Sequence, residues 1–361
     1  MIERALIVGG HEVWEQGHGM SERAEFGDLQ AEMTAQWLEN VKSKFGNVSA
    51  YIESRQSAYL DRWREAGRFI DDGSDILDIG GGYIYDSLAQ YLIDRRFSYR
   101  FRDVDQGTVD NAKEVATRLG LNAPSIEHGF NDNLTLPDGD VDAVFSSHCI
   151  EHSIDLQKTF QELYRVIRPG GNLLMGVPFG WEANPAHPYF FGPNEWVALV
   201  QDAGFEIRSA QISYELAESG ADYFIAARKT KKSSGSRIDP RDYLKDSFQY
   251  VSQKDQSVSY VGQFDIGDEF AKSIQDGAII RIDPPAGATQ ILPILNRYEW
   301  AGRVSLRSGA VTELEDLYSW YPYVMPTRPL PVRGSCLEVE VTGRNDVSRW
   351  TEVMFAGYMW R

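Results

Sequence analysis

The sequence predicts a doubly wound α/β domain followed by a separate, mainly antiparallel β domain. From residue 75 to residue 228, short apolar runs alternate with segments of helical periodicity, which is typical of a parallel sheet covered by helices on both faces. From residue 238 onward, short alternating runs such as "GRVSLRSG" and "SCLEVEVTG" are bounded by Gly, Pro and Asn, which indicates an antiparallel β-sandwich. Between them lies "KTKKSSGSR" (229–237), which is basic and Ser-rich and predicts a linker.

The expected elements follow from the spacing of the apolar residues. Residues 1–50 are expected to be an N-terminal extension, helical after one short strand, and residues 51–228 the α/β domain. The segments "DLQAEMTAQWLENVKSKF" and "SAYLDRWREAGRFI" have helical spacing. The strands expected after them are 76–79, 99–102, 141–146, 172–177, 205–212 and 223–227. Further helices are expected near residue 86 and over 107–119, 155–167 and 194–203.

The composition is that of an ordinary water-soluble protein. The chain has 361 residues, of which 42% are hydrophobic and 25% charged, enough for one large or two medium domains. A formal net charge of −17 disfavours binding to nucleic acid or to an anionic membrane. No apolar run reaches the ~18 residues of a membrane helix, and Cys149 and Cys336 make no disulfide framework. We expect a cytoplasmic protein with no nucleic-acid partner and no membrane span; homo-oligomerisation stays open.

The stretch "SDILDIGGGYIYDS" (74–87) is the most informative part of the chain. A strand ends in three glycines and a helix follows, an arrangement that lets the backbone approach a nucleotide closely. No Lys follows, which excludes a P-loop, and Tyr85 replaces the third glycine of a dinucleotide fingerprint. The remaining pattern is D-x-G-x-G, in which Asp78 ends the strand. An acid there suits a positively charged ligand, such as a sulfonium or an amine, and would repel a phosphate.

Four motifs in order carry a resemblance to a known family. They are "ILDIGGG", "FRDVDQGTVDNAKEVA", "FNDNLTLPDGDVDAVFSSHCIEH" and "LYRVIRPGGNLLMGVP". With them, roughly residues 51–228 resemble class I, Rossmann-like, S-adenosylmethionine (SAM)-dependent methyltransferases, especially those of small molecules and sugars. The resemblance implies that SAM is the cofactor. The cofactor-binding residues that it implies are Asp78, Gly80, Gly81, Gly82, Asp103, Asn131, Asp132 and Ser147.

Within that resemblance, the glycines pass under the methionine part of SAM and one acid holds both ribose hydroxyls. Val109 and Ala112 fall six and nine residues after Asp103, which favours Asp103 over Asp105 as the ribose ligand. A single carboxylate can accept both hydroxyl hydrogen bonds. The alternatives are a surface ion pair of Asp103 with its flanking arginines and a turn-capping role for Asp78.

Two further features of the cofactor region are less typical. Asn131 and Asp132 are candidates for the adenine amine, with an Asx turn as the alternative. Ile84 stands where many members of the family have a third glycine, which leaves the turn geometry near the sulfonium open.

The segment "HCIEH" (148–152) has two interpretations. It matches H-x-x-E-H, the inverted zinc-protease signature, but it directly follows a strand, and similar segments occur here in the methyltransferases. We expect His148 or His152 to be the base that removes a proton from an acceptor hydroxyl, and we expect no metal. The alternative is a histidine that only caps or packs at the start of a helix.

Aromatic residues suggest where the acceptor binds. The loop "PFGWEANPAHPYFFGPNEW" (178–196) is long for a connection and is a candidate substrate lid. Trp181, His187 and Tyr189 are its acceptor-binding candidates, with simple packing of the loop as the alternative. The C-terminal domain is also rich in aromatics, which form either its core or a carbohydrate-binding face: Trp300, Trp320, Tyr321, Tyr323, Trp350 and Trp360.

The sequence therefore predicts a SAM-dependent methyltransferase that methylates a sugar hydroxyl in a polysaccharide or a sugar-containing metabolite. The partner is then a small-molecule or glycan acceptor. One alternative is an O- or N-methyltransferase of another small metabolite. An alternative of a different class is a non-catalytic SAM-binding protein with a glycan-binding or assembly module.

Overall fold

The computed structural model describes residues 48–153, 155–181, 187–213, 222–230 and 238–361. Two compact units are distinguished, residues 1–131 and 132–361. The short N-terminal strand and the helix expected over 28–45 lie outside the described residues. The next expected helix is confirmed as α2 (Val48–Ala66), which a 3₁₀ turn, η1 (Gly67–Phe69), extends.

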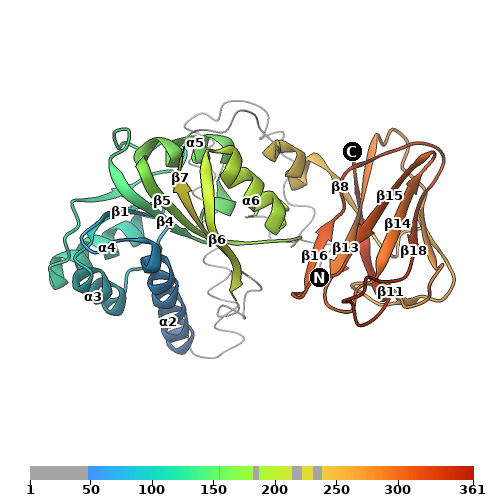
Figure 1. The fold of residues 1–361 in the computed structure, drawn as a ribbon, viewed down its shortest axis with the longest axis horizontal. Helices are drawn as coiled ribbons and strands as arrows, with labels where there is room; N and C mark the ends of the chain where they lie inside the picture. The colour runs from blue at the N-terminus through green and yellow to red at the C-terminus, as the bar shows by residue number, and fades with distance from the viewer. Residues whose placement is uncertain (1–47, 154, 182–186, 214–221, 231–237) are drawn as a thin grey trace. The chain divides into compact units, whose positions relative to one another are not determined.

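The α/β part contains a seven-stranded sheet in the order β3-β2-β1-β4-β5-β7-β6. Figure 1 labels its strands β1, β4, β5, β6 and β7. The strands are β1 (Asp75–Ile79), β2 (Ser98–Asp103), β3 (Ser125–His128), β4 (Val141–Ser147), β5 (Ile167–Pro178), β6 (Phe205–Ser213) and β7 (Asp222–Lys229). All six expected strands are present. The sequence did not predict β3, because "SIEH" is short and has a single apolar residue.

One strand departs from the predicted parallel arrangement. β7 runs antiparallel to both β5 and β6, whereas the pairs β1–β2, β2–β3 and β4–β5 are parallel. A parallel neighbour requires a crossover of a dozen or more residues, and only eight residues separate Ser213 from Asp222. The connection is too short, so β7 returns alongside β6. Asp222 consequently starts its strand opposite Pro178, the last residue of β5.

Four α-helices of the α/β part follow their strands as expected: α3 (Asp86–Asp94), α4 (Gln106–Leu119), α5 (Leu156–Val166) and α6 (Pro193–Asp202). In α4, Val109 and Ala112 lie on the buried face. The Asp105 side chain caps the N-terminus by accepting hydrogen bonds from the backbone N–H groups of residues 107 and 108, and Gly120 ends the helix at φ 70°. Local capping signals therefore set the bounds of this helix.

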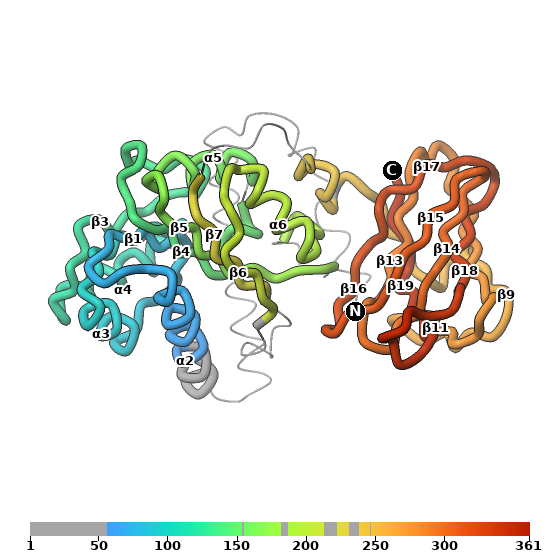
Figure 2. Tube along the Cα trace, viewed as in Figure 1, coloured from blue at the N-terminus to red at the C-terminus, as the bar shows by residue number. Residues whose placement is uncertain are grey.

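The C-terminal region consists of two antiparallel sheets, as expected (Figure 2). One has the order β15-β14-β18-β12-β9, and the other contains β10-β11-β19-β13-β16, with β17 on β13 and β8 on β19. The strands are β8 (Gln249–Ser252), β9 (Val258–Val261), β10 (Asp265–Ile266), β11 (Ala271–Ser273), β12 (Ile279–Ile282), β13 (Gln290–Arg297), β14 (Arg303–Ser308), β15 (Val311–Asp316), β16 (Tyr323–Pro326), β17 (Leu330–Pro331), β18 (Leu337–Val341) and β19 (Val353–Trp360). Short 3₁₀ turns, η3 (Pro240–Tyr243) and η4 (Lys245–Ser247), precede them.

Both sheets contribute to one hydrophobic core. Leu306 and Val339 come from one sheet, Leu295 and Phe355 from the other, and all four are fully buried in the same cluster. At roughly 25 cal/mol per Å² of buried apolar surface, such a core is the main stabilising term of the region.

A second apolar cluster joins the loop after β5 to the C-terminal sheets. Phe190 packs with Phe248, Ile294 and Met325, and Trp181 lies against the same cluster. The backbone supports this packing, because the Trp181 N–H donates to the Val324 carbonyl at 2.6 Å. The loop is therefore part of a packed interface within this unit.

None of the helices in the described residues is both long enough and apolar enough to span a bilayer.

Candidate functional site

Each glycine of the turn after β1 is required for its own reason. Gly80 and Gly82 have φ values of 66° and 60°, a backbone region that side chains disfavour. At Gly81 a Cβ atom would lie 2.4 Å from Oδ2 of Asp78 and 2.9 Å from the Phe101 ring. The turn thus places backbone without side chains, half-buried at Gly80 and Gly82, next to a buried acid at the end of β1.

Asp78 is that acid, and it is 0% exposed. Its Oδ2 accepts hydrogen bonds from the hydroxyls of Tyr99 at 2.7 Å and Tyr59 at 3.3 Å. Its Oδ1 is buried and has no hydrogen-bond partner among the described residues. Burial raises the pKa of Asp78 to about 7, and the charge of Asp103 contributes to the rise. A buried carboxylate with one unsatisfied oxygen is a receptor for a cationic group.

Asp103 ends β2 and binds the same turn. Its Oδ2 accepts from the Gly82 N–H at 3.2 Å, and its Oδ1 from the Asp105 N–H at 2.9 Å. Burial raises the pKa of Asp103. A side-chain contact with Thr108 adds to these, and a carboxylate with four lone-pair sites still has room for a further donor. Asp105, the rejected candidate, instead caps α4. The flanking Arg100 and Arg102 pair with Asp75 and Glu127.

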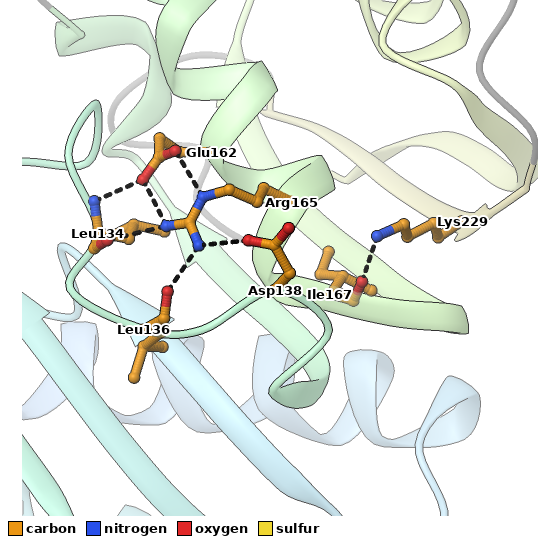
Figure 3. Close-up of polar contacts among 7 residues, drawn as sticks. All are labelled: Leu134, Leu136, Asp138, Glu162, Arg165, Ile167 and Lys229. Carbon is orange, nitrogen blue, oxygen red and sulfur yellow. Dashed lines mark hydrogen bonds and ion pairs between the residues drawn. The ribbon is translucent and has the colours of Figure 1, made fainter.

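The loop that carries Asp132 is held by Arg165 of α5 (Figure 3). The Arg165 guanidinium donates to the carbonyls of Leu134 at 2.8 Å and Leu136 at 2.6 Å. It also donates to both oxygens of Glu162, which in turn accepts from the Leu134 N–H at 2.8 Å. Asp132 is buried and Asn131 half-buried. The fixed loop gives Asp132 a defined position.

The end of β4 carries a histidine in an unusual conformation. Ser147 is buried, and His148 follows it with φ 53°, a left-handed value that is rare for residues other than glycine. The His148 N–H donates to the Gly176 carbonyl at 2.9 Å. Its Nε2 lies 2.8 Å from Oδ1 of Asp222, which is 1% exposed. A buried carboxylate therefore lies at ion-pair distance from the imidazole.

Glu151 and two further histidines lie in the same region. Ile150–His152 form a 3₁₀ turn, η2. Oε1 of Glu151 lies 3.5 Å from Nδ1 of His148 and 3.9 Å from Nε2 of His152. The rings of His152 and His187 are 4.6 Å apart between centroids. Burial opposes ionisation of Glu151, but the polar contact with His148 and the charges of all three histidines lower its pKa to about 2.

The three acceptor candidates of the loop after β5 occupy different surroundings. His187 lies beside His152. Trp181 stacks on Tyr250 with ring centroids 6.2 Å apart, and Tyr189 stacks on Phe191 at 5.1 Å. Burial raises the pKa of Tyr189 above its usual range. Packing accounts for Trp181 and Tyr189, and their role in acceptor binding stays a prediction.

A comparison with protein families decides what this arrangement is. Residues 77–175 match the family model described as a methyltransferase domain. Residues 77–175 are thus similar to a methyltransferase domain. The glycine turn, Asp78, Asp103 and the end of β4 all fall inside the matched residues or at their edge.

Curated relatives agree with this family. The chain is 32% identical over 143 residues to a probable S-adenosylmethionine-dependent methyltransferase of Mycolicibacterium smegmatis, a match that covers 37% of this chain and 53% of that protein. It is 25% identical over 160 residues to the uncharacterized methyltransferase YdaC of Bacillus subtilis, covering 44% of this chain and 86% of that protein. The chain thus spans about half the length of the Mycolicibacterium smegmatis relative.

Solved structures are similar to about half of the chain. A SAM-dependent methyltransferase from Aquifex aeolicus aligns with TM-score 0.40 and 21% identity, over 47% of this chain and 90% of that one. The 1,6-didemethyltoxoflavin-N1-methyltransferase of Burkholderia thailandensis, solved with S-adenosylhomocysteine, aligns with TM-score 0.43 and 16% identity, over 56% of this chain and 90% of that one.

The residues of the methyltransferase domain fit SAM. The unsatisfied Oδ1 of Asp78 suits the positive charge of the methionine part. The Asp103 carboxylate, as an acceptor at the end of β2, suits a ribose hydroxyl, and no Cβ can be added at Gly81 without displacing the Asp78 side chain. The binding roles of the individual residues remain predictions.

Sequence reasoning missed Asp222. An acid at the start of "DYFIAAR" looks like an ordinary strand-end residue. Its significance comes from the antiparallel pairing of β7 with β5, which brings Asp222 to the edge where β4 and β5 end. An acid opening an otherwise apolar strand was the one signal available.

Proposed function

We propose that the whole chain is an O-methyltransferase that transfers a methyl group from SAM to a hydroxyl of a sugar-containing acceptor. The observation that carries this proposal is the His148–Asp222 pair, with 2.8 Å between Nε2 and Oδ1. A hydroxyl must lose its proton as it is methylated, and an oriented imidazole is suited to take it. A neutral amine acceptor would have no such need.

The residues have distinct roles in this proposal. Asp103 accepts hydrogen bonds from both ribose hydroxyls, and Asp78 faces the cationic methionine end above the bare backbone of Gly80, Gly81 and Gly82. Asn131 or Asp132 contacts the adenine amine, and Ser147 lies on the cofactor side of β4. When bound, SAM supplies the methyl group on its sulfonium. His148 removes the acceptor proton, and Asp222 stabilises the imidazolium that results.

Burial of the carboxylates assigned to or near the site should strengthen their interactions with charged groups. Asp78, Glu151 and Asp222 are each at most 3% exposed, and charges interact more strongly where water is excluded. Methyl transfer from a sulfonium otherwise depends mainly on positioning.

The carbohydrate part of the proposal is supported by exposed tryptophans of the β region. Trp300, Trp320 and Trp350 are 47%, 57% and 55% exposed. Their loops are linked through the backbone: residues 298 and 318 form one bridge, and residues 301 and 352 another. Exposed indole rings on neighbouring loops are suited to stack on sugar rings. This supports a glycan-binding role, which also fits the non-catalytic alternative.

The test is methyl transfer from labelled SAM to a panel of monosaccharides, nucleotide sugars, oligosaccharides and non-sugar alcohols and amines. We expect transfer to a sugar hydroxyl, with the product's new methyl ether located by mass spectrometry. Transfer only to amines would contradict O-methylation. SAM binding without transfer to any acceptor would favour the non-catalytic alternative.

A further inference from the structure

We propose that Glu151, His152 and His187 form a binding site for one divalent transition-metal ion that holds the acceptor hydroxyl. The three side chains each offer a ligand atom, and these atoms all lie within 4.8 Å of one another. Ligands of one ion lie roughly 3–3.5 Å apart, given metal–ligand bonds of about 2.1 Å. Small side-chain rotations would close the remaining distance.

Glu151 is the observation that points to a ligand. It is 3% exposed, and neither of its carboxylate oxygens has a hydrogen-bond partner among the described residues. A buried anion is costly unless it is paired or coordinates a metal. The nitrogens of His148 and His152, at 3.5 Å and 3.9 Å, lie at ion-pair distance. A bound cation would satisfy the carboxylate directly.

The donor set indicates the class of metal. Two imidazoles and one carboxylate are the ligands of catalytic zinc sites and of open transition-metal sites. Mg²⁺ and Ca²⁺ prefer oxygen ligands alone. Three protein ligands also leave coordination positions open, and these can take an oxygen of the acceptor.

The arrangement differs from the zinc-protease signature that the sequence also matched. That signature uses both histidines of H-x-x-E-H as ligands and the glutamate as the base. Here Nε2 of His148 faces Asp222 at 2.8 Å, while the third ligand is His187 from the loop after β5. The glutamate is then a ligand, and His148 remains the base.

This inference rests on the proposed O-methylation for its chemistry. Coordination of the acceptor hydroxyl lowers its pKa and fixes its oxygen toward the methyl group. His148 takes the proton, the oxygen forms a bond to the methyl carbon, and the carbon–sulfur bond breaks with its electron pair passing to sulfur. The products are a methyl ether, S-adenosylhomocysteine and one proton on His148.

Metal binding is tested on the full chain, first stripped with a chelator and then titrated with Zn²⁺ or Co²⁺. Calorimetry and the visible absorption of Co²⁺ report on the site without any activity measurement. We expect one equivalent to bind, and His187→Ala to weaken binding by about 100-fold or more, since losing even an outer-shell partner costs 10–100-fold. Glu151→Gln preserves side-chain shape and should have a similar effect.

His128→Ala is the matched control. His128 lies at the end of β3, where its Nε2 is 2.9 Å from the Val104 carbonyl oxygen, and it is not one of the three proposed ligands. This variant should bind the metal normally. Failure of the stripped protein to bind either ion, or equal binding by His187→Ala, overturns the site. SAM affinity, measured in the same variants, should stay unchanged.

Activity separates this inference from the proposed function. If the metal binds but no acceptor hydroxyl is methylated, the proposed function fails while the metal site stands. If sugar methylation proceeds equally in stripped and reloaded protein, the proposed function stands while the role of the ion is overturned.

Discussion

At the scale of single residues, Asp78 makes cofactor binding depend on pH. Its folded-state pKa of about 7 lies above the ordinary value of 3.8, so the free protein takes up a proton near neutrality. A cationic ligand favours the ionised form, and SAM affinity should therefore rise from pH 6 to pH 8. Calorimetry in buffers of different ionisation enthalpy should detect the released proton. Asp78→Asn should bind SAM weakly and without this pH dependence.

Asp78 should make the stability of the SAM-free protein fall as pH rises, whereas it makes SAM affinity increase. Because Asp78 binds its proton more tightly in the folded state, this contribution is complete below pH 3.8, declines as pH rises above that value and is fully lost above about 7. Without SAM, Asp78→Asn should be more stable than the parent at pH 8, by about 2–4 kcal/mol. Thermal unfolding at pH 5 and pH 8 measures this. A variant that is less stable at both values would show that the hydrogen bonds from Tyr99 and Tyr59 outweigh burial.

Asp103 and Asp105 lie two residues apart, but replacing each with Ala should affect a different property of the protein. Asp103→Ala should weaken SAM binding by about 1.5–3 kcal/mol, the usual contribution of hydrogen bonds to a charged group. Asp105→Ala removes the cap of α4 and should cost about 1 kcal/mol of stability, with SAM affinity nearly retained. Unchanged affinity in Asp103→Ala, measured by calorimetry, would argue against its contact with the ribose.

Variants of the proposed catalytic pair, His148 and Asp222, should lose turnover while keeping cofactor binding. His148→Ala should reduce turnover by about two to four orders of magnitude, the usual contribution of a general base, with little effect on SAM affinity. Asp222→Asn keeps the shape of the partner but removes its charge, and should shift the pH–rate profile as well as lower the rate. If neither replacement slows transfer, the base lies elsewhere.

At the scale of elements, Arg165 ties the loop before β4 to helix α5 (Figure 3). Its guanidinium donates hydrogen bonds to two loop carbonyls, and also to the carboxylates of Glu162 and Asp138. Arg165→Ala should therefore destabilise the protein by about 2 kcal/mol or more, because partly buried acceptors lose charged donors. Arg168→Ala is the control, since its exposed pair with Asp142 should contribute at most about 1 kcal/mol. Chemical denaturation distinguishes the two, and equal effects would contradict the role given to Arg165.

At the scale of the whole molecule, the loop after β5 depends on the C-terminal region. The sequence predicted a linker over 229–237; Lys229 belongs to β7, and residues 231–237 lie outside the described residues. Ending the chain at Thr230 would remove the partners of Phe190 and Trp181. We expect such a fragment to aggregate or to bind an apolar dye, as seen by light scattering and fluorescence. A monodisperse fragment that binds SAM normally would support independent domains.

The sequence by itself determined the order and nature of most elements. Apolar periodicity located six strands of the α/β sheet, and the D-x-G-x-G turn indicated a nucleotide-like ligand with positive charge. These signals are local: a strand ending in glycines or an N-cap such as Asp105 acts within a few residues of itself. The methyltransferase domain could be predicted from the sequence for the same reason, because its motifs lie in contiguous stretches.

Only the tertiary structure decided which distant residues share a site. Asp222 reaches His148 because β7 runs antiparallel to β5. The rings of His187 and His152 lie side by side although 34 positions separate them in the sequence. The expectation of no metal considered only the acids near Glu151 in the sequence, and the metal titration proposed above tests it. Ligand sets and base–carboxylate pairs are defined by distances of a few ångströms, and the spacing of residues along a chain does not encode those distances.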